Sequence, residues 1–332
     1  MMMKNNLLLI SFLSIIFFFS ACETDFDVNA DWQEITIVYG LLNQTDTNHY
    51  LRINKAFLGG NALEVAQIED SSSYKNALAV IMEGWQGDDL KQSIEFDTTR
   101  IANKDSGLWY NPYMVIYKGS GVLNENYEYR LKIVNTQSGK EIFSKTQIVK
   151  DFSITKPNAG GKASFLRGYS SKFFWKNAVN AIRYEPLIRF NYYEVPNGTT
   201  DTIPKFLDWY QGTQFADNTS GYGDIEIYVS GDGFYETLDR RLDKSFVGHR
   251  LAGVVDYIVS AAGEEYDTYM KVNGPSNSLV QDRPEYTNIE NGIGLLSSRY
   301  TKSRTLQLNP ITEQEIINME DLSFVKSPYV GK

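Results

Sequence analysis

Residues 127–149 read YEYRLKIVNTQSGKEIFSKTQIV, and this stretch decides the class of fold. Its first half carries large apolar side chains at every second position, namely Tyr127, Tyr129, Leu131 and Ile133. Charged residues occupy the positions between them, which is typical of a β-strand with one buried face. A glycine-containing turn at 137–140 then leads into Ile142–Val149, which carries a second strand pattern. The stretch therefore predicts a β-hairpin that lies on a hydrophobic core.

The same two-residue period occurs in four shorter segments that precede the hairpin. They are Ile35, Ile37, Tyr39 and Leu41; Leu51 and Ile53; Leu78, Val80 and Met82; and Ile94 and Phe96. Several short strands with no helical segment between them are typical of two sheets packed face to face. We therefore predict that residues 32–150 form an immunoglobulin-like β-sandwich.

A break in the pattern follows at residues 156–161, where Lys156-Pro157 and two glycines disfavour both strand and helix. We place the junction between two domains there, because about 310 residues are more than one core usually organises. Further strands are expected at 173–175, 184–192, 225–229 and 255–259. Pro186 lacks a ladder donor, so its strand is expected at a sheet edge or with a bulge.

Helical patterns alternate with these later strands. Phe234, Leu238 and Leu242 repeat every four residues from Asp232, and a second helix is expected from Gly263. A third follows Pro310, where Thr312 and Glu315 have the spacing of a capping box. The sequence thus predicts a mainly β protein, in which residues 151–332 form a β-rich α+β domain with a C-terminal helix.

The N-terminus carries the pattern of an export signal. Lys4 supplies a positive charge, and Leu7–Ala21 is an unbroken run of apolar and small residues. The run has about 15 residues, fewer than the roughly 20 that a membrane-spanning helix needs. Ser20 and Ala21 provide the small residues that a lipoprotein peptidase requires before a cysteine. We predict that residues 1–21 are a lipoprotein signal peptide and that Cys22 is lipidated.

Cys22 is the only cysteine, so lipidation would leave the mature chain without a disulfide. Several acyl chains on this residue would hold the protein on a membrane permanently. The alternatives are ordinary cleavage that leaves a free thiol, or an uncleaved N-terminal anchor. Residues 22–31 read as an acidic tether, and acidic residues after a lipidated cysteine favour the outer face of the outer membrane. The spacing of Asp25, Asp27, Asn29 and Asp31 resembles a calcium loop, but Ala30 and Thr36 stand where that loop needs Gly and Glu.

Composition excludes several classes of function. The net charge is −9 and no cationic run occurs, so nucleic acid is not an expected partner. The chain has two histidines, His49 and His249, which disfavours a metal site or a histidine-based catalytic triad. We predict no cofactor, no metal and no catalytic residue. The adjacent Glu264 and Glu265 read as a solvated pair in the first turn of a helix.

Two clusters of aromatic residues are the candidate binding sites. One holds Trp109, Tyr110 and Tyr113, and the other holds Trp209 and Tyr210, both in turn-like contexts. Flat aromatic faces can stack on sugar rings or contact a partner protein. The alternative is that these side chains pack in cores and at sheet ends, as they often do in strand-rich domains.

Several segments together resemble a known family. They are Tyr39–Asn43, His49–Leu58, Trp175 with Asn180, Ala181 and Tyr184, and Tyr286–Gly294. The chain is similar in these segments to the bacterial lipoproteins catalogued as domain of unknown function 4249. The resemblance implies an outer-membrane lipoprotein from bacteria with many TonB-dependent uptake systems, and a receptor of that kind as a partner. It implies no catalytic residue.

The leading hypothesis is a non-enzymatic binding or accessory lipoprotein of an outer-membrane uptake system, which captures a glycan or another nutrient. Two alternatives remain: a surface hydrolase that uses carboxylates on glycans, and a structural protein of the cell envelope. A deep cleft with convergent carboxylates would favour hydrolysis, whereas a shallow aromatic surface would favour binding.

Overall fold

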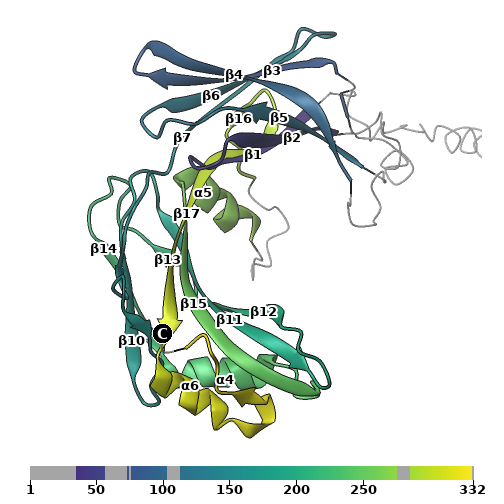
Figure 1. The fold of residues 1–332 in the computed structure, drawn as a ribbon. Coiled ribbons are helices and arrows are strands. Elements are labelled where there is room, and N and C mark those ends of the chain that lie inside the picture. Colours follow the sequence, from purple (N-terminus) through teal and green to yellow (C-terminus); the bar gives the residue numbers. More distant parts are fainter. Residues whose placement is uncertain (1–34, 57–72, 75, 103–112, 275–284, 331–332) are drawn as a thin grey trace, which may run out of the picture.

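The computed structural model describes residues 35–56, 73–74, 76–102, 113–274 and 285–330. Within these residues the protein is mainly β, as predicted, and its strands β1–β18 form one sheet of 15 strands and one of three. Figure 1 shows an upper part built from the N-terminal strands and a lower part that contains the helices α4 and α6.

The upper part is an immunoglobulin-like sandwich. Its strands are β1 (Ile35–Leu42), β2 (Asn48–Ala56), β3 (Leu78–Gln86), β4 (Asp89–Ile101), β5 (Met114–Ser120), β6 (Glu128–Asn135) and β7 (Glu141–Gln147). They follow the spatial order β1-β2-β5-β4-β3-β6-β7, and β3, β4 and β6 lie above β1, β2 and β5 in Figure 1. In immunoglobulin folds the first, second and fifth strands lie in one layer, and the third, sixth and seventh strands lie in the other. The strand order of the upper part matches this arrangement.

The predicted hairpin is present as β6 and β7, with the turn between them at Gly139 in a left-handed conformation. Tyr129, Leu131 and Ile133 are buried in the core of the sandwich. The hydroxyl of Tyr129 accepts a hydrogen bond from the backbone N–H of Asn124 at 2.7 Å. A tyrosine near the start of the sixth strand that bonds to backbone just upstream is the tyrosine corner of immunoglobulin folds.

The stripe predicted for the first strand is wrong about the side that faces the core. Val38 and Leu42 are buried in the sandwich, whereas Ile35, Ile37, Tyr39 and Leu41 lie on the opposite, partly exposed face. Both faces of β1 carry apolar residues, so the alternation alone did not distinguish them. As a result Tyr39 lies on the outer surface of the sheet.

The lower part continues the 15-stranded sheet and adds a small second sheet. Its strands are β8 (Ile154–Lys156), β9 (Lys162–Ala163), β10 (Ser170–Lys176), β11 (Arg183–Pro196), β12 (Ile203–Tyr210), β13 (Gln214–Phe215), β14 (Asp224–Ser230), β15 (Gly248–Ala262), β17 (Ile293–Leu308) and β18 (Phe324–Val325). β16 (Ile289–Glu290) pairs with β7 in the upper part. The small sheet has the order β14-β10-β8 and packs on β11 and β15. Phe173 of β10, for example, meets Tyr257 of β15 edge-on at 5.1 Å.

Pro186 lies on β11, which is an interior strand between β12 and β15 and not an edge strand. The carbonyl oxygen of Pro186 accepts a hydrogen bond from the N–H of Gln211, just after β12 has ended. Because the N–H and C=O of a strand residue point to the same side, the missing donor faces the end of β12 and removes no bond to β15. The predicted bulge is present, but it lies at Phe190–Tyr192.

The three predicted helices are α4 (Gly231–Arg241), α5 (Glu264–Asn273) and α6 (Pro310–Ile317), with a short 3₁₀ turn, η2 (Glu320–Leu322), after the last. Ser230 caps α4 by accepting a bond from the N–H of Gly233, and Asn309 caps α6 through the N–H of Ile311. None of the helices in the described residues is both long and apolar enough to cross a membrane.

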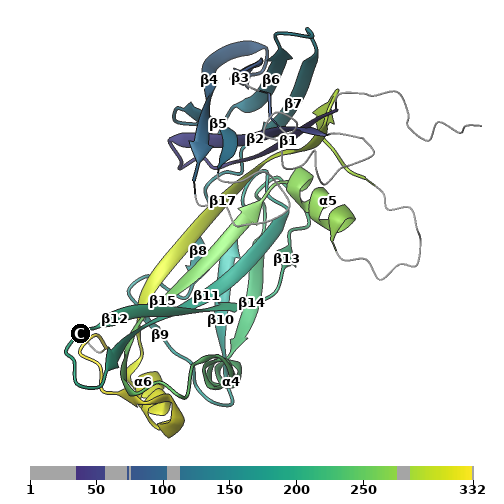
Figure 2. The same ribbon diagram turned by 90° about the vertical axis from the view of Figure 1, so that its right-hand side faces the viewer.

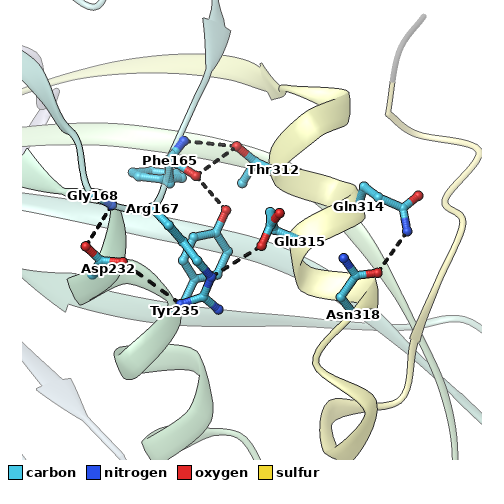
Figure 3. Close-up of polar contacts among 9 residues, drawn as sticks. All are labelled: Phe165, Arg167, Gly168, Asp232, Tyr235, Thr312, Gln314, Glu315 and Asn318. Atoms are coloured by element: carbon cyan, nitrogen blue, oxygen red, sulfur yellow. Dashed lines mark hydrogen bonds and ion pairs between the residues drawn. The ribbon is translucent and has the colours of Figure 1, made fainter.

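The capping box predicted in α6 is wrong, because Thr312 and Glu315 contact another segment. Figure 3 shows Thr312 bonded to the backbone of Phe165, and Glu315 paired with Arg167 at 3.3 Å. The Arg167 guanidinium also lies over the ring of Tyr235 in α4 at 4.3 Å. Residues 165–168 therefore join α4 to α6 at the lower end of the molecule.

β17 belongs to both parts of the molecule. Its first half pairs with β1 in parallel, from Ile37↔Ile293 to Leu42↔Ser298, and its second half pairs with β15. Figure 2 shows it running from the sandwich to the lower end. Ile289 and Leu296 pack in the sandwich core with residues from β1–β7. The chain therefore leaves the upper part after β7, returns to complete it with β16 and the first half of β17, and enters the lower part again along the second half of β17.

After β7 the chain crosses from the upper to the lower part between two adjacent residues. Ile148 packs in the sandwich core, and Val149 packs in the core of the lower part. Ser298 links this crossing to β17, the other segment that joins the two parts. Its buried hydroxyl accepts a hydrogen bond from the N–H of Val149 and donates one to the carbonyl of Gln147. The break at 156–161, predicted as the junction, lies between β8 and β9 inside the lower part. The division into domains at residue 150 stays a prediction.

Candidate functional site

The candidate site is a groove on the outer face of the sandwich, where β2 and β5 separate. The ladder between these strands runs from Asn48↔Ser120 to Leu51↔Tyr117 and then ends. Beyond that point β2 pairs with β1, and β5 pairs with β4. The groove has a volume of about 570 Å³, and its lining includes Tyr39, Tyr50, Arg52, Arg100, Ile116 and Lys118. We name it the β2–β5 groove.

The middle of the groove is apolar. Because β5 lies between β2 and β4 in the sheet order, its residues Met114, Ile116 and Lys118 run between the other lining residues. Ile116 is only 4% exposed, although the neighbouring Tyr117 is the residue that packs in the sandwich core. Ile116 therefore forms the floor of the groove, and the longer side chains of β1, β2 and β4 stand around it.

Tyr39 is held in place by a residue from the lower part. Its ring meets the ring of Tyr269 in α5 edge-on, with centroids 6.1 Å apart, and the two hydroxyl oxygens are 3.3 Å apart. This hydrogen bond, together with burial, raises the pKa of Tyr269 to about 12, so the Tyr269 hydroxyl stays protonated at neutral pH. Tyr39 keeps 38% of its surface exposed and Tyr50 keeps 49%. Two tyrosine faces are thus available beside the groove.

The charges around the groove are all positive. Arg52, Arg100 and Lys118 line it, and no carboxylate is among the described residues of the lining. Nε of Arg52 donates to Oδ1 of Asn54 at 2.9 Å, which orients the guanidinium along β2. Lys118 is directly opposite Asp97 in the β4–β5 ladder, but among the described residues Lys118 forms no ion pair. The groove is therefore a local cationic site on a protein of net charge −9.

Only Tyr113 of the first predicted aromatic cluster lies within the described residues. Trp109 and Tyr110 are outside them, and so is the predicted lipidation site Cys22. Tyr113 is described, directly before β5, and the guanidinium of Arg100 lies over its ring at 4.3 Å. A cation over a tyrosine ring at this distance is a favourable contact. Tyr113 therefore orients a cation of the groove.

The second predicted cluster lies in the lower part, at the end of β12 and not in a turn. Trp209 is half-buried, and its ring contacts Phe165 and Phe234 at centroid distances of 6.5 and 6.2 Å. Tyr210 beside it is 69% exposed. β12 and β5 lie at opposite ends of the molecule in Figure 1, so Tyr113, which directly precedes β5, is far from the second cluster.

Another groove, of about 590 Å³, lies elsewhere on the sandwich and is lined by residues such as Gln44, Lys91, Glu125 and Tyr127. Its lining carries charges of both signs together with several amides, so no single ligand chemistry follows from it. The β2–β5 groove has one sign of charge and two exposed aromatic faces, which makes it the better-defined site.

The described histidines do not converge on a site. His49 is buried at the start of β2 and its Nε2 donates to the carbonyl of Gly121 at 2.9 Å. His249 lies in β15. In the described part of the chain no group of three or more His, Cys, Asp or Glu side chains could hold a metal ion.

The interpretation of Glu265 as a solvated residue is wrong. Glu264 is exposed, but Glu265 is turned inward from α5, and its Oε2 accepts a bond from the hydroxyl of Ser297 at 3.0 Å. Thr146 of β7 lies 3.4 Å from the same oxygen. Burial raises the pKa of Glu265, and the nearby Glu264 adds to the effect. Glu265 lines neither groove, so it links α5 to β7 and β17 and is not placed to act as a catalytic acid.

Glu265→Gln should change how stability depends on pH. The folded state raises the pKa of Glu265 above its ordinary value of 4.5, so the wild-type protein loses stability as pH rises from that value through the raised pKa. Glutamine does not titrate, so the variant should become progressively more stable relative to wild type between pH 4 and pH 7. Urea unfolding at several pH values measures this difference. The exposed Glu264→Gln is the control, and a difference that stays constant with pH for Glu265→Gln would contradict the assignment.

Comparison with known proteins adds little. No protein-family model matches the chain, and no curated protein matches it. Among solved structures, the chain is similar to the C-terminal globular domain of an oligosaccharyltransferase from Pyrococcus abyssi, with a TM-score of 0.25 and 13% sequence identity. The match covers 66% of this chain and 45% of that one, so the chain spans less than half of its length. A TM-score this low carries no argument about function.

Proposed function

We propose that this protein is a lipid-anchored, non-enzymatic binding protein of the bacterial outer membrane, which captures a glycan nutrient in the β2–β5 groove for an uptake system. Lipidation of Cys22 and the tether at 22–31 would fix it to the membrane. A TonB-dependent receptor would accept the captured ligand. The resemblance in segments such as Tyr39–Asn43 and Tyr286–Gly294 supports this setting.

The groove is the observation that carries the proposal. It is shallow, apolar along its floor at Ile116, and flanked by the exposed rings of Tyr39 and Tyr50. Sugar rings have apolar C–H faces that stack on aromatic rings, and hydroxyl groups that bond to polar side chains at the periphery. The contact between Tyr39 and Tyr269 fixes one ring before a ligand arrives, which lowers the entropy cost of binding.

A glycan array probed with the full-length protein in detergent tests the proposal. Wild type is expected to bind at least one class of glycan, and the double variant Tyr39→Ala/Tyr50→Ala should bind it about tenfold more weakly or worse, since each stacked ring contributes on the order of 1 kcal/mol. Tyr228→Ala removes an exposed tyrosine from β14 in the lower part and should leave binding unchanged. Unfolding curves for the variants confirm that the fold is intact.

Affinity capture from native membranes tests the setting. The wild-type protein should co-isolate a TonB-dependent receptor, whereas Cys22→Ser should lose both the acyl label and the membrane attachment. The proposal is wrong if the wild type binds no glycan on the array and co-isolates no such receptor.

A further inference from the structure

We infer that the ligand of the β2–β5 groove is an acidic saccharide, a short chain of sugar rings that carries carboxylate groups. This inference rests on the proposed function, because it names the chemical class of the ligand that the same groove would capture. It is carried by the charges, the aromatic rings and the apolar floor, each of which constrains a different part of the ligand.

The positively charged side chains that line the groove favour an anionic ligand. Arg52 and Lys118 come from neighbouring strands, and the described residues offer neither of them a carboxylate at ion-pair distance. Four other cations on the sandwich are paired with carboxylates: Arg130 and Lys145 with Glu128, Lys132 with Glu141, and Lys91 with Asp89. Lys118 faces Asp97 across the β4–β5 ladder but forms no ion pair with it, so Arg52 and Lys118 together still favour a negatively charged group in the groove.

The position of Lys118 places this negative charge beside an aromatic ring. Lys118 is directly opposite Tyr50 in the β2–β5 ladder, and Arg52 is directly opposite Tyr39 in the β1–β2 ladder. Side chains at opposite ladder positions on one face of a sheet have Cβ atoms about 5 Å apart. A cation therefore stands beside each exposed tyrosine. A ligand that fits both pairs needs a flat apolar face and an anionic group within one repeating unit, as in a uronic acid.

Simpler ligands use only part of this arrangement. An inorganic anion would neutralise Arg52 and Lys118 but would leave the Tyr39 and Tyr50 faces and the Ile116 floor in contact with water. A neutral glycan would stack on the rings but would leave the two cations without a counter-charge. An acidic saccharide satisfies both, and guanidinium and ammonium groups bind carboxylates through charge-assisted hydrogen bonds.

Isothermal titration of the full-length protein in detergent tests the inference. The probes are acidic trisaccharides, namely trigalacturonate and trimannuronate, each beside its neutral counterpart, galactotriose or mannotriose. At least one acidic probe should bind about tenfold more tightly than its neutral counterpart, because a charge-assisted hydrogen bond contributes enough for that ratio. Raising the salt concentration should reduce the difference.

Arg52→Gln and Lys118→Gln should each reduce affinity for the acidic trisaccharide about tenfold, and should reduce affinity for the neutral one by a clearly smaller factor. Lys145→Gln is the matched control, because Lys145 is an exposed cation on β7, away from the groove. Equal binding of acidic and neutral probes, with no effect of Arg52→Gln or Lys118→Gln, would overturn the inference and leave glycan capture intact. Binding of no saccharide would contradict both. If triglutamate binds more tightly than every saccharide, the ligand is an acidic peptide and the inference is wrong. If phosphatidylglycerol vesicles bind more tightly than every saccharide, the ligand is a lipid surface and the inference is likewise wrong.

Discussion

Glu194→Ala is expected to lower the free energy of unfolding by about 3–5 kcal/mol, because it leaves a buried guanidinium without its counter-charge. Arg250 in β15 is 1% exposed, and its Nη2 and Nε lie 2.9 and 3.1 Å from Oε1 of Glu194 in β11. The remaining bonds of Arg250 go to the backbone carbonyls of Leu322 and Asp243. These carbonyls carry no net charge, so they do not replace the carboxylate.

Urea unfolding measures this loss, and Glu185→Ala is the matched control. Glu185 lies on the same strand and pairs with Arg183, but its side chain is 42% exposed. An exposed pair of this kind contributes about 1 kcal/mol or less. Glu194→Gln should lie between wild type and Glu194→Ala, since it keeps a hydrogen-bond acceptor and loses the charge. Equal destabilisation by Glu194→Ala and Glu185→Ala would show that the buried ion pair contributes no more to the free energy of unfolding than the exposed one.

Gly294→Ala should cost about 3 kcal/mol or more, since it combines backbone strain with a steric clash. Gly294 has φ of +123°, which residues with a side chain rarely adopt. A Cβ atom at this position would lie 1.9 Å from the carbonyl oxygen of Val38, its partner in the ladder between β1 and β17. The strands must therefore move apart, and the sandwich loses the strand that borders β1.

Gly139→Ala separates the two contributions. Gly139 also has a positive φ, of +73°, but an added Cβ would meet no atom within 4 Å. It should therefore cost only the strain of the conformation, about 1 kcal/mol. Unfolding curves give the two losses, and hydrogen exchange at Val38 should become faster only in Gly294→Ala. Similar losses in both variants would mean that the contact between β1 and β17 is easily rearranged.

The parts of the fold that the sequence predicted correctly are those set by local patterns. The hairpin at 127–149 combines a two-residue period with a glycine turn, and the helix after Ser230 combines a cap with a four-residue repeat. Periodicity failed at Ile35–Leu42, where both faces of the strand are apolar.

The groove could not be predicted in the same way. Tyr39, Arg52 and Lys118 each look like an ordinary outward-facing residue of a strand, and only the sheet order brings them together. Glu265 was misread for a related reason, because its hydroxyl partner Ser297 lies on a strand that enters the sandwich from far along the chain. Local sequence contains no signal for a pairing such as Ile37↔Ile293.

The late return of β17 also fixes an order of assembly. In an exported chain the N-terminal part crosses the inner membrane first, so β1 reaches the far side before its parallel neighbour β17. During that interval β1 is an uncovered sheet edge, the kind of surface on which nascent chains aggregate. The edge of β1 thus stays uncovered until β17 pairs with it. A chaperone that shields this edge would protect the protein during its biogenesis.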